Sequence, residues 1–355
     1  MLNRGWIEID LGALVRNARA LQERAGVPLI PMIKADAYGL GADKVAHALE
    51  PLSPMAFGVA TVSEGEQLRS AGIATPIVIF TPLLVSDMAA AHSAALTPTL
   101  GSAAEIEAWA EYGGDYDLSI DTGMSRAGLP WREMKNLIDV ILRYPPRGAF
   151  THFHTPDSLD AIGHQEARFR EAIGQLPERP RVLHTDSSGA IARHGKSEWD
   201  AVRPGIFMYG VGSGEGAGLE PECVVHVRAP IVEIRWVEPG DTVSYDATWT
   251  AKSRRRIATI PLGYADGYPR NAGQSGVGVV RERIVPISGR VTMDMIMFDV
   301  TETGAEIGDV VTLIGNGIDL QAPIDVAAVA RLAGMSPYEL LTGLRGRLRR
   351  VYRDG

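Results

Sequence analysis

The chain has 355 residues, of which 45% are hydrophobic and 22% are charged, and its formal net charge is −8. This composition is typical of a globular protein with one large domain and a smaller one, and the acidity argues against nucleic acid as the main partner. No apolar run is long enough to span a membrane and the start lacks a signal-peptide core, so we expect a cytoplasmic protein without membrane contact. The single cysteine, Cys223, excludes an internal disulfide and a cysteine-based metal cluster.

Short apolar runs alternate with amphipathic segments from about residue 11 to residue 205. Asp10 is placed to cap a helix, because the apolar residues after it recur at helical spacing. Strand-like runs follow at 29–33, 56–60, 77–80, 95–97, 116–120, 148–153, 181–184 and 200–203. Eight strand–helix units predict an α/β fold, a (β/α)8 barrel of the TIM type. A doubly wound open sheet is the alternative, but no glycine fingerprint follows the first strand.

After residue 220 the sequence becomes rich in β-strand patterns separated by turn signals. The runs lie at 224–227, 231–236, 242–245, 256–261, 276–280, 283–287, 295–300 and 310–314. They predict a mostly antiparallel β domain. We therefore expect a barrel domain at 11–220 and a β-rich C-terminal domain at 221–355, together with the strand-like start at 1–10. Apolar residues interleave the basic end at 345–350, which favours a packed terminal strand over an anion-binding tail.

Lys34 directly follows the apolar run 28–33, and lysines are only five of the 35 basic residues. Burying an unpaired ammonium is costly, so a lysine at the end of a buried strand tends to be neutral or covalently bonded. Lysine, unlike arginine, can also lose its proton. The alternative is a lysine that only extends its amine from the strand end to solvent.

Polar residues gather where other predicted strands end, at 121–128, 151–154, 184–189 and 203–206. In a βα barrel these ends share one mouth. Ser187 and Ser188, with the loop after strand eight, suit a phosphate, although a serine helix cap is the alternative. The histidines lack the partners of a metal site, so we expect no metal. An amine, a phosphate pocket and Tyr38 near the amine suggest pyridoxal 5′-phosphate bonded to Lys34 as a Schiff base.

At these positions the chain resembles the alanine racemase family of fold-type III pyridoxal-phosphate enzymes, over essentially its whole length. The motifs that carry the resemblance are Lys34-Ala35-Asp36-Ala37-Tyr38-Gly39, Asp121-Thr122-Gly123-Met124, Thr151-His152-Phe153, Arg203-Pro204-Gly205-Ile206 with Tyr209-Gly210, Gly263-Tyr264-Ala265-Asp266-Gly267-Tyr268-Pro269-Arg270, and Gly289-Arg290-Val291-Thr292-Met293-Asp294. The resemblance implies interconversion of L-alanine and D-alanine in the cytoplasm, supplying D-alanine for peptidoglycan.

The resemblance also implies residue roles. Lys34 holds the cofactor and is one catalytic base, and Tyr264 is the base on the opposite face. The remaining implied roles are cofactor binding by Tyr38, His152, Ser188, Arg203, Gly205, Ile206 and Tyr338, substrate binding by Arg126 and Met293, and orientation of Tyr264 by His184. In the family the residues matching Tyr264 and Met293 come from the partner subunit, which implies a homodimer with shared active sites.

The chemistry of racemisation fits two bases, because a proton leaves one face of the α-carbon and returns to the other. Lysine and tyrosine both have high intrinsic pKa values, so each needs its pKa lowered. Arg203 at the pyridine nitrogen does not readily give up its proton, which limits the charge that the ring accepts and disfavours transamination.

The chain departs from the family pattern near Arg126. The family commonly has a lysine at the position of Ser119, where a carbamate forms and braces the arginine, and serine cannot form it. We expect a bound chloride or rearranged hydrogen bonds to support Arg126 instead. Further departures are Leu40, Ser125, Ser187, Thr292 and Met295.

Three alternatives stay open at this point. The first is a racemase for serine, lysine or a broader set of amino acids. The second is a fold-type III decarboxylase, which predicts an acidic partner for the pyridine nitrogen and a cysteine near the site. The third is a pyridoxal-phosphate carrier built from a barrel alone, which needs no second base.

Overall fold

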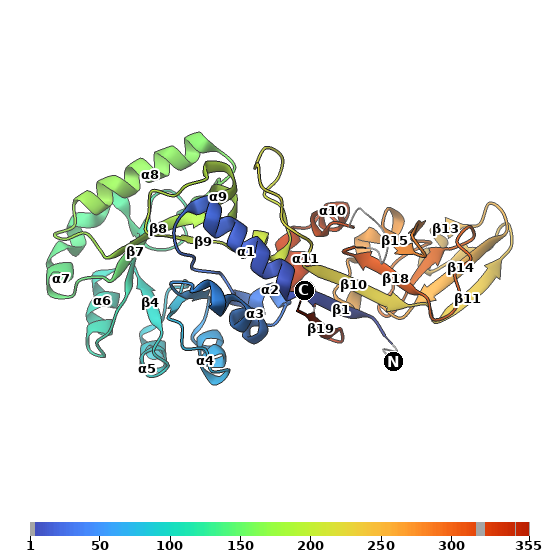
Figure 1. The fold of residues 1–355 in the computed structure, drawn as a ribbon, viewed down its shortest axis with the longest axis horizontal. Coiled ribbons are helices and arrows are strands. Elements are labelled where there is room, and N and C mark those ends of the chain that lie inside the picture. The colour runs from blue at the N-terminus through green and yellow to red at the C-terminus, as the bar shows by residue number, and fades with distance from the viewer. Residues whose placement is uncertain (1–3, 317–323, 345, 355) are drawn as a thin grey trace.

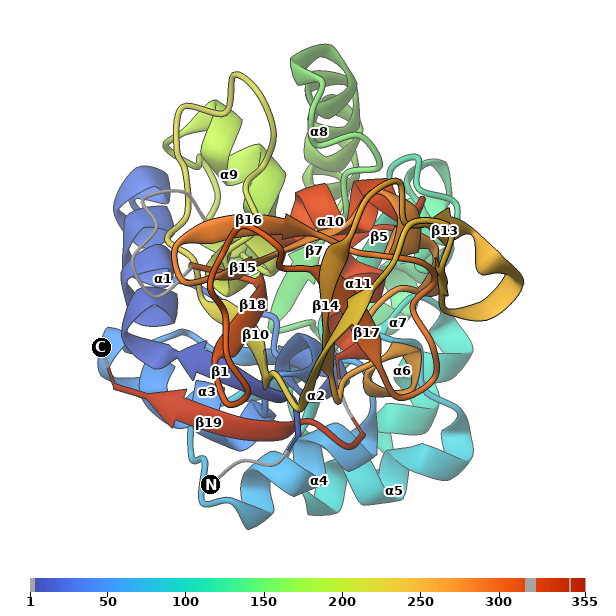
Figure 2. The ribbon, with the colours of Figure 1, turned by 90° about the vertical axis from the view of Figure 1, so that its right-hand side faces the viewer.

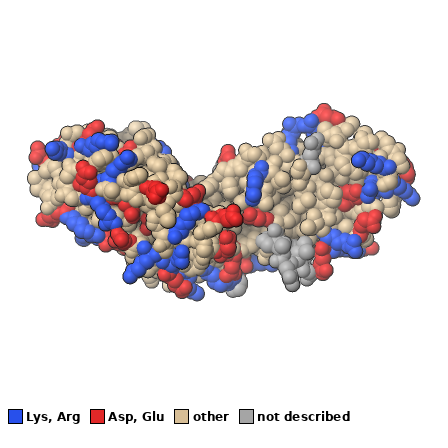
Figure 3. Space-filling model, turned by 90° about the horizontal axis from the view of Figure 1, so that it is seen from above, with Lys and Arg blue, Asp and Glu red and all other residues tan. Residues whose placement is uncertain are grey.

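The computed structural model describes residues 4–316, 324–344 and 346–354. Residues 1–3 of the strand-like start and Arg345 of the basic end therefore lie outside the described residues. Two lobes lie side by side, an α/β lobe from the first half of the chain and a β lobe from the second half (Figure 1). In the space-filling view the surface is hollowed between the lobes, and acidic and basic side chains are interspersed (Figure 3).

The α/β lobe is a barrel of parallel strands that neighbour one another in chain order. The strands are β2 (Phe57–Val59), β3 (Ile77–Ile79), β4 (Thr97–Leu100), β5 (Asp117–Asp121), β7 (Gly148–Phe150), β8 (Val182–Ser187) and β9 (Ala201–Arg203), with β6 (Leu129–Pro130) paired to β5. The surrounding helices are α1 (Leu11–Ala25), α3 (Ala42–Leu49), α4 (Val62–Ser70), α5 (Val85–Ser93), α6 (Ala103–Ala110), α7 (Ile138–Arg143), α8 (Leu159–Gly174) and α9 (Ser188–His194). The predicted barrel class is confirmed, and the open sheet is wrong.

The first predicted strand, at 29–33, forms only isolated bridges. Leu29 bridges Val202 of β9, and Met32 bridges Gly58 of β2, so this segment fills the gap between the two ends of the strand series. Pro28 and Pro31 flank and interrupt the segment, and proline has no N–H to donate to a ladder. The segment therefore closes the barrel without becoming a regular strand.

Helix α1 shows how the sequence sets a helix boundary. The Asp10 carboxylate accepts a hydrogen bond from the Ala13 N–H at 2.7 Å, which satisfies a donor that the first turn leaves free. Gly26 ends the helix with a φ of 70°, a left-handed conformation that glycine adopts without steric cost. The predicted cap and the helix that follows it are both confirmed.

The β lobe contains a six-stranded sheet in the order β16 (Arg283–Pro286), β15 (Val277–Val280), β18 (Val310–Ile314), β10 (Val225–Pro230), β1 (Trp6–Asp10) and β19 (Arg349–Arg353). A second sheet holds β11 (Glu233–Val237), β14 (Arg255–Ile260) and β17 (Ile296–Asp299), and β12 (Thr242–Val243) pairs with β13 (Trp249–Thr250). Figure 2 shows this lobe in front of the barrel. The first strand of the chain thus lies in the β lobe, while the domain limit at residue 220 stays a prediction.

Helix α11 (Pro337–Gly343), which follows α10 (Val326–Leu332), brings the end of the β lobe onto the barrel (Figure 1). It packs beside Gly39, where a Cβ would lie 2.7 Å from the Leu341 carbonyl oxygen. Only glycine permits this approach, so the segment that starts at Lys34 is in direct contact with the second lobe. Within the described residues, no helix is both long and apolar enough to cross a membrane.

Candidate functional site

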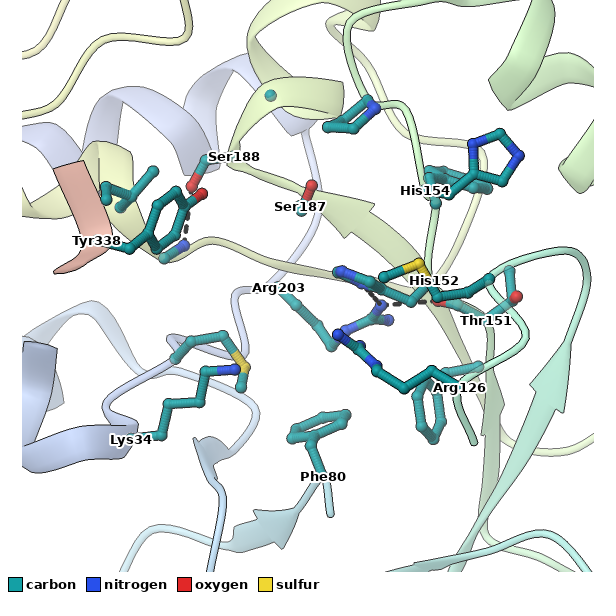
Figure 4. Close-up of a pocket in the computed structure, with 18 of the residues that line it drawn as sticks. Lys34, Phe80, Arg126, Thr151, His152, His154, Ser187, Ser188, Arg203 and Tyr338 are labelled. Atoms are coloured by element: carbon teal, nitrogen blue, oxygen red, sulfur yellow. Dashed lines mark hydrogen bonds between the residues drawn. The ribbon is translucent and has the colours of Figure 1, made fainter. Parts of the chain in front are cut away.

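A cavity of ≈ 880 Å³ lies where the barrel strands end. Figure 4 shows Lys34 entering it from one side and Arg126 from another, with Arg203 and His152 in the centre of the view and Ser188 beside Tyr338. Tyr38, Gly205, Ile206 and Tyr338 also line it. Nine of the twelve predicted site residues therefore converge, as expected for the carboxyl ends of parallel strands.

Lys34 begins an unusual turn, α2 (Lys34–Gly39). Its residues Ala35, Asp36, Ala37 and Tyr38 all have φ between 52° and 56°, so most of the turn is left-handed. This left-handed conformation costs roughly 1–2 kcal/mol for each residue that has a Cβ. The turn places the side chains of both Lys34 and Tyr38 at the cavity.

Contacts from three directions hold this turn. The Glu64 carboxylate accepts from the Ala35 N–H at 2.8 Å, and the Asp36 carboxylate accepts from the Ala42 N–H at 2.8 Å. Arg350 of β19 pairs with Asp36 at 2.7 Å. The surrounding structure thus over-determines a backbone conformation that the local sequence disfavours.

The Lys34 amine has a lowered pKa. Burial is the largest cause, and the positive charge of Arg126 acts in the same direction. Both effects disfavour the ammonium form, so the amine is closer to its nucleophilic and basic form at neutral pH than a surface lysine is.

Hydroxyl groups gather at one end of the cavity. The Ser188 Oγ accepts from the Gly205 N–H at 2.8 Å, and the Tyr38 ring lies 4.6 Å from Tyr209 and 6.0 Å from Tyr338, between ring centroids. A Cβ at Gly205 would lie 2.6 Å from the Tyr38 hydroxyl. Glycine at this position therefore lets the backbone approach the tyrosine and the serine closely.

Arg203 is buried and tightly held. One terminal nitrogen donates to the His184 Nδ1 at 2.9 Å and to its carbonyl, and the other donates to the carbonyls of Thr151 and Thr185. Burial lowers the pKa of Arg203 to about 10, so the guanidinium stays charged at neutral pH. Its Nε has no hydrogen-bond partner among the described residues, which leaves one donor for an acceptor in the cavity.

His152 is the neutral histidine of the cavity wall. Burial lowers its pKa to about 3, and the charges of Arg203 and Arg126 add to the effect. Its Nδ1 lies 3.4 Å from Arg203. It reaches the cavity as an uncharged imidazole.

His184 lies beneath the cavity wall, in contact with Arg203. It is fully buried, with Nδ1 taken by Arg203 and Nε2 3.3 Å from Asp117. Both ring nitrogens thus have partners within this chain, and the orientation of Tyr264 by His184 stays a prediction. Within this chain His184 supports Arg203 by accepting its hydrogen bond. Burial lowers the pKa of His184 to about 4.

Asp117 anchors His184, and the motifs in the sequence do not point to it. Burial by itself would raise the pKa of Asp117, but its hydrogen bond to His184 and the charge of Arg147 outweigh it, so the pKa is lowered. The Arg147 guanidinium donates two hydrogen bonds to Asp117, at 2.7 and 3.0 Å. A lone aspartate inside an apolar strand is the signal that could have identified it.

Arg126 lines the main cavity, whereas Ser119 lines a separate cavity of ≈ 200 Å³ together with Glu105. No carboxylate of the described residues pairs with Arg126. The expected anion beside it stays a prediction, and Glu105 is a like charge that would oppose an anion in the smaller cavity.

Tyr264 and Met293 lie on the β lobe, outside the cavity, and are 39% and 52% exposed. Their loops are joined, because the Tyr264 N–H donates to the Thr292 carbonyl at 3.0 Å and the Ala265 N–H donates to the Met293 carbonyl at 3.1 Å. The structure therefore brings these two residues together with each other but not with Lys34 of the same chain.

The comparisons with known proteins agree over both lobes. Residues 9–213 match the family model "Alanine racemase, N-terminal domain" and residues 224–352 match "Alanine racemase, C-terminal domain". A curated alanine racemase of Citrifermentans bemidjiense is 35% identical, over 98% of this chain and 98% of its own. A solved alanine racemase from E. faecalis has 27% identity and a TM-score of 0.93, over 99% of each chain. One from Bacillus anthracis, solved with bound L-Ala-P, has 28% identity and a TM-score of 0.90, over 99% of this chain and 96% of its own.

Proposed function

The chain belongs to the alanine racemase family, and from this premise we propose that it interconverts L-alanine and D-alanine with Lys34 and Tyr264 as its two bases. Members of this family are pyridoxal-phosphate-dependent amino-acid racemases, which are isomerases. The observation that carries the proposal is the buried Lys34 amine, with its lowered pKa, in the cavity that Arg126 also lines.

The residues present fit pyridoxal 5′-phosphate. When bound, this cofactor supplies an aldehyde that bonds an amine and a ring that stabilises negative charge at the substrate α-carbon. Lys34 would hold the aldehyde carbon, and the free donor of Arg203 suits the ring nitrogen. The hydroxyls of Tyr38, Ser188 and Tyr338, with the backbone at Gly205 and Ile206, form a donor set that suits the phosphate.

The two bases serve opposite faces. The Lys34 Nζ takes or returns the α-proton on one face, and the Tyr264 Oη does so on the other. Arg126, with Met293, binds the substrate carboxylate and so fixes which face of the α-carbon each base meets. Because burial and nearby guanidinium charge keep the Lys34 amine poised to accept a proton, it can act as a base near neutral pH.

Arg203 and its support limit side reactions. With a pKa of about 10, Arg203 keeps its proton at neutral pH and stays a hydrogen-bond donor toward the ring nitrogen. His184 and Asp117 hold this guanidinium in place. A decarboxylase with an acidic group at this position is disfavoured by the same geometry.

The active unit we propose is a homodimer. Tyr264 and Met293 are exposed and lie away from the Lys34 cavity of their own chain, so a second copy is needed to complete each site. A carrier has no need for a second base, so the Tyr264 loop argues against that alternative. The cellular role we propose is supply of D-alanine for peptidoglycan in the cytoplasm.

Tyr264→Phe tests the two-base proposal. Losing one positioned base lowers racemisation about 10²–10⁴-fold, because only one face can then exchange its proton. In D₂O we expect the variant to exchange the α-hydrogen of one alanine enantiomer and not of the other, measured by NMR. Tyr245→Phe, at another exposed tyrosine of the β lobe, is the control and leaves racemisation unchanged. Full racemisation by Tyr264→Phe would overturn the proposal.

A further inference from the structure

We propose that Gln165 and Arg168 of α8 are positioning residues that hold the loop carrying Arg126, and thereby fix where the substrate carboxylate binds. The two residues lie one helical turn apart, on the same side of α8. Both donate to Thr122, at the start of the loop between β5 and β6. The inference deepens the proposed function, because it rests on the role of Arg126 given there.

The Gln165 amide joins two catalytic segments. Gln165 is 1% exposed; its Oε1 accepts from the His154 N–H at 3.0 Å, and its Nε2 donates to the Thr122 Oγ1 and the His152 carbonyl, both at 3.1 Å. The acceptor and both donor hydrogens of the amide are thus used. The loop after β5, which carries Arg126, is held in register with the segment after β7, which carries His152.

The Arg168 side chain holds the backbone of the same loop. Its guanidinium donates to the Thr122 carbonyl at 2.7 Å. A Cβ at Gly123 would lie 3.1 Å from that guanidinium, and Gly123 has a φ of +147°, so glycine lets the loop lie against α8. Asp121 then closes the loop internally by accepting from the N–H groups of Gly123 at 2.8 Å and Ser125 at 3.1 Å.

These contacts supply support that Ser119 does not. Arg126 forms no ion pair with a carboxylate of the described residues, and Ser119 lines a different cavity. The position of the Arg126 side chain therefore follows from the position of its backbone, which α8 sets through Thr122. A buried amide that loses its partners leaves other polar groups unsatisfied, so its removal should loosen the whole loop.

The test compares holoenzymes of Gln165→Met and Arg168→Met with wild type and with Arg170→Met. Arg170 is an exposed arginine of the same helix that pairs with Glu198, so its variant is the matched control. The readouts are hydrogen exchange of the backbone at 120–127, the Kd of propionate (a carboxylate without an amine), and kcat and KM for alanine.

We expect Gln165→Met and Arg168→Met to speed exchange at 120–127 and to raise the propionate Kd and the alanine KM together, by about tenfold, the equivalent of one lost hydrogen bond to a charged group. Arg168→Lys restores most of the affinity, and Arg170→Met matches wild type. Where Gln165→Met fails to fold, Thr122→Val removes the same hydrogen bond from the loop side.

Unchanged exchange and an unchanged propionate Kd in these variants would overturn the inference. A wild type that binds propionate but does not racemise alanine would sink the proposed function instead, while the exchange measurement would still decide whether α8 holds the loop.

Discussion

The barrel mouth and the exposed loops of the β lobe differ in how they present their functional residues. At the mouth, Arg203 and His184 are buried and hydrogen-bonded to each other, and Lys34 lies in the cavity beside them. On the β lobe, Tyr264 and Met293 are 39% and 52% exposed and do not line the cavity that holds Lys34. The side chains of the mouth are thus fixed by contacts within one chain, whereas those of the β lobe are left accessible for the second subunit that we propose.

Exposure of the β-lobe loops does not mean that they are loosely held. Asp266, two residues after Tyr264, is buried and accepts from the Gly263 N–H at 2.9 Å and from Arg347 at 3.1 Å. Arg347 also reaches Asp294 at 2.6 Å, next to Met293. The Tyr264 loop is therefore exposed at its tip but held firmly at its base, which suits the partner contact that we propose.

Lys34→Ala should have the largest effect and tests the barrel side of this comparison. Losing both the covalent attachment and one base should lower racemisation at least about 10⁴-fold. Borohydride should fix the cofactor to the Lys34 peptide of wild type and to no peptide of the variant, as measured by mass spectrometry. Lys44→Ala, at an exposed lysine of α3, is the control; equal activity of the two variants would contradict the assignment of Lys34.

Mixing the Lys34→Ala and Tyr264→Phe variants tests whether the β-lobe residue Tyr264 completes the site of a second subunit. If each site takes Lys34 from one subunit and Tyr264 from its partner, a mixed dimer has one intact site, and random exchange of subunits restores about a quarter of wild-type activity. Activity is assayed after the two inactive proteins are unfolded and refolded together. No recovery, with mixed dimers present by mass spectrometry, would place both bases in one chain and break the comparison.

The smallest effect concerns the pH dependence of stability. His184 has a pKa of about 4 in the folded chain, against 6.5 ordinarily, so between these values the unfolded chain binds more protons. The free energy of unfolding should therefore fall as pH falls from about 6.5 to 4, by about 2–3 kcal/mol at pH 4.5 from this group.

Denaturant unfolding from pH 7 to pH 4.5 measures this effect. His184→Gln should flatten the slope, and His47→Gln, at an exposed histidine of α3, should retain it. His152, with a pKa of about 3, keeps part of the slope in both variants. An identical slope in wild type and His184→Gln would show that His184 does not contribute to the loss of stability at low pH.

The sequence predicts the barrel and the β lobe because apolar periodicity is a local property that survives in the folded chain. It overestimates the first strand because Pro28 and Pro31 remove donors that periodicity does not register. It does not reveal that His184 contacts Asp117 and Arg203, because the contacts of a buried imidazole depend on residues distant in sequence. The contacts of Gln165 carry only a weak local signal: its position falls on the apolar stripe of α8 with Ile162 and Phe169, but a glutamine on that stripe does not indicate which distant groups it meets.

The left-handed turn after Lys34 makes the barrel mouth depend on a strand of the β lobe. Two side chains from β19 reach that turn and its end, Arg350 to Asp36 and the Tyr352 hydroxyl to the Leu40 carbonyl at 3.0 Å. Tyr352 lies 312 positions after Leu40 in the chain, so this contact is made only when distant parts of the chain have folded together. We therefore expect a chain in which β19 is unpaired from β1 to hold the Lys34 turn less firmly, even where the barrel itself has formed.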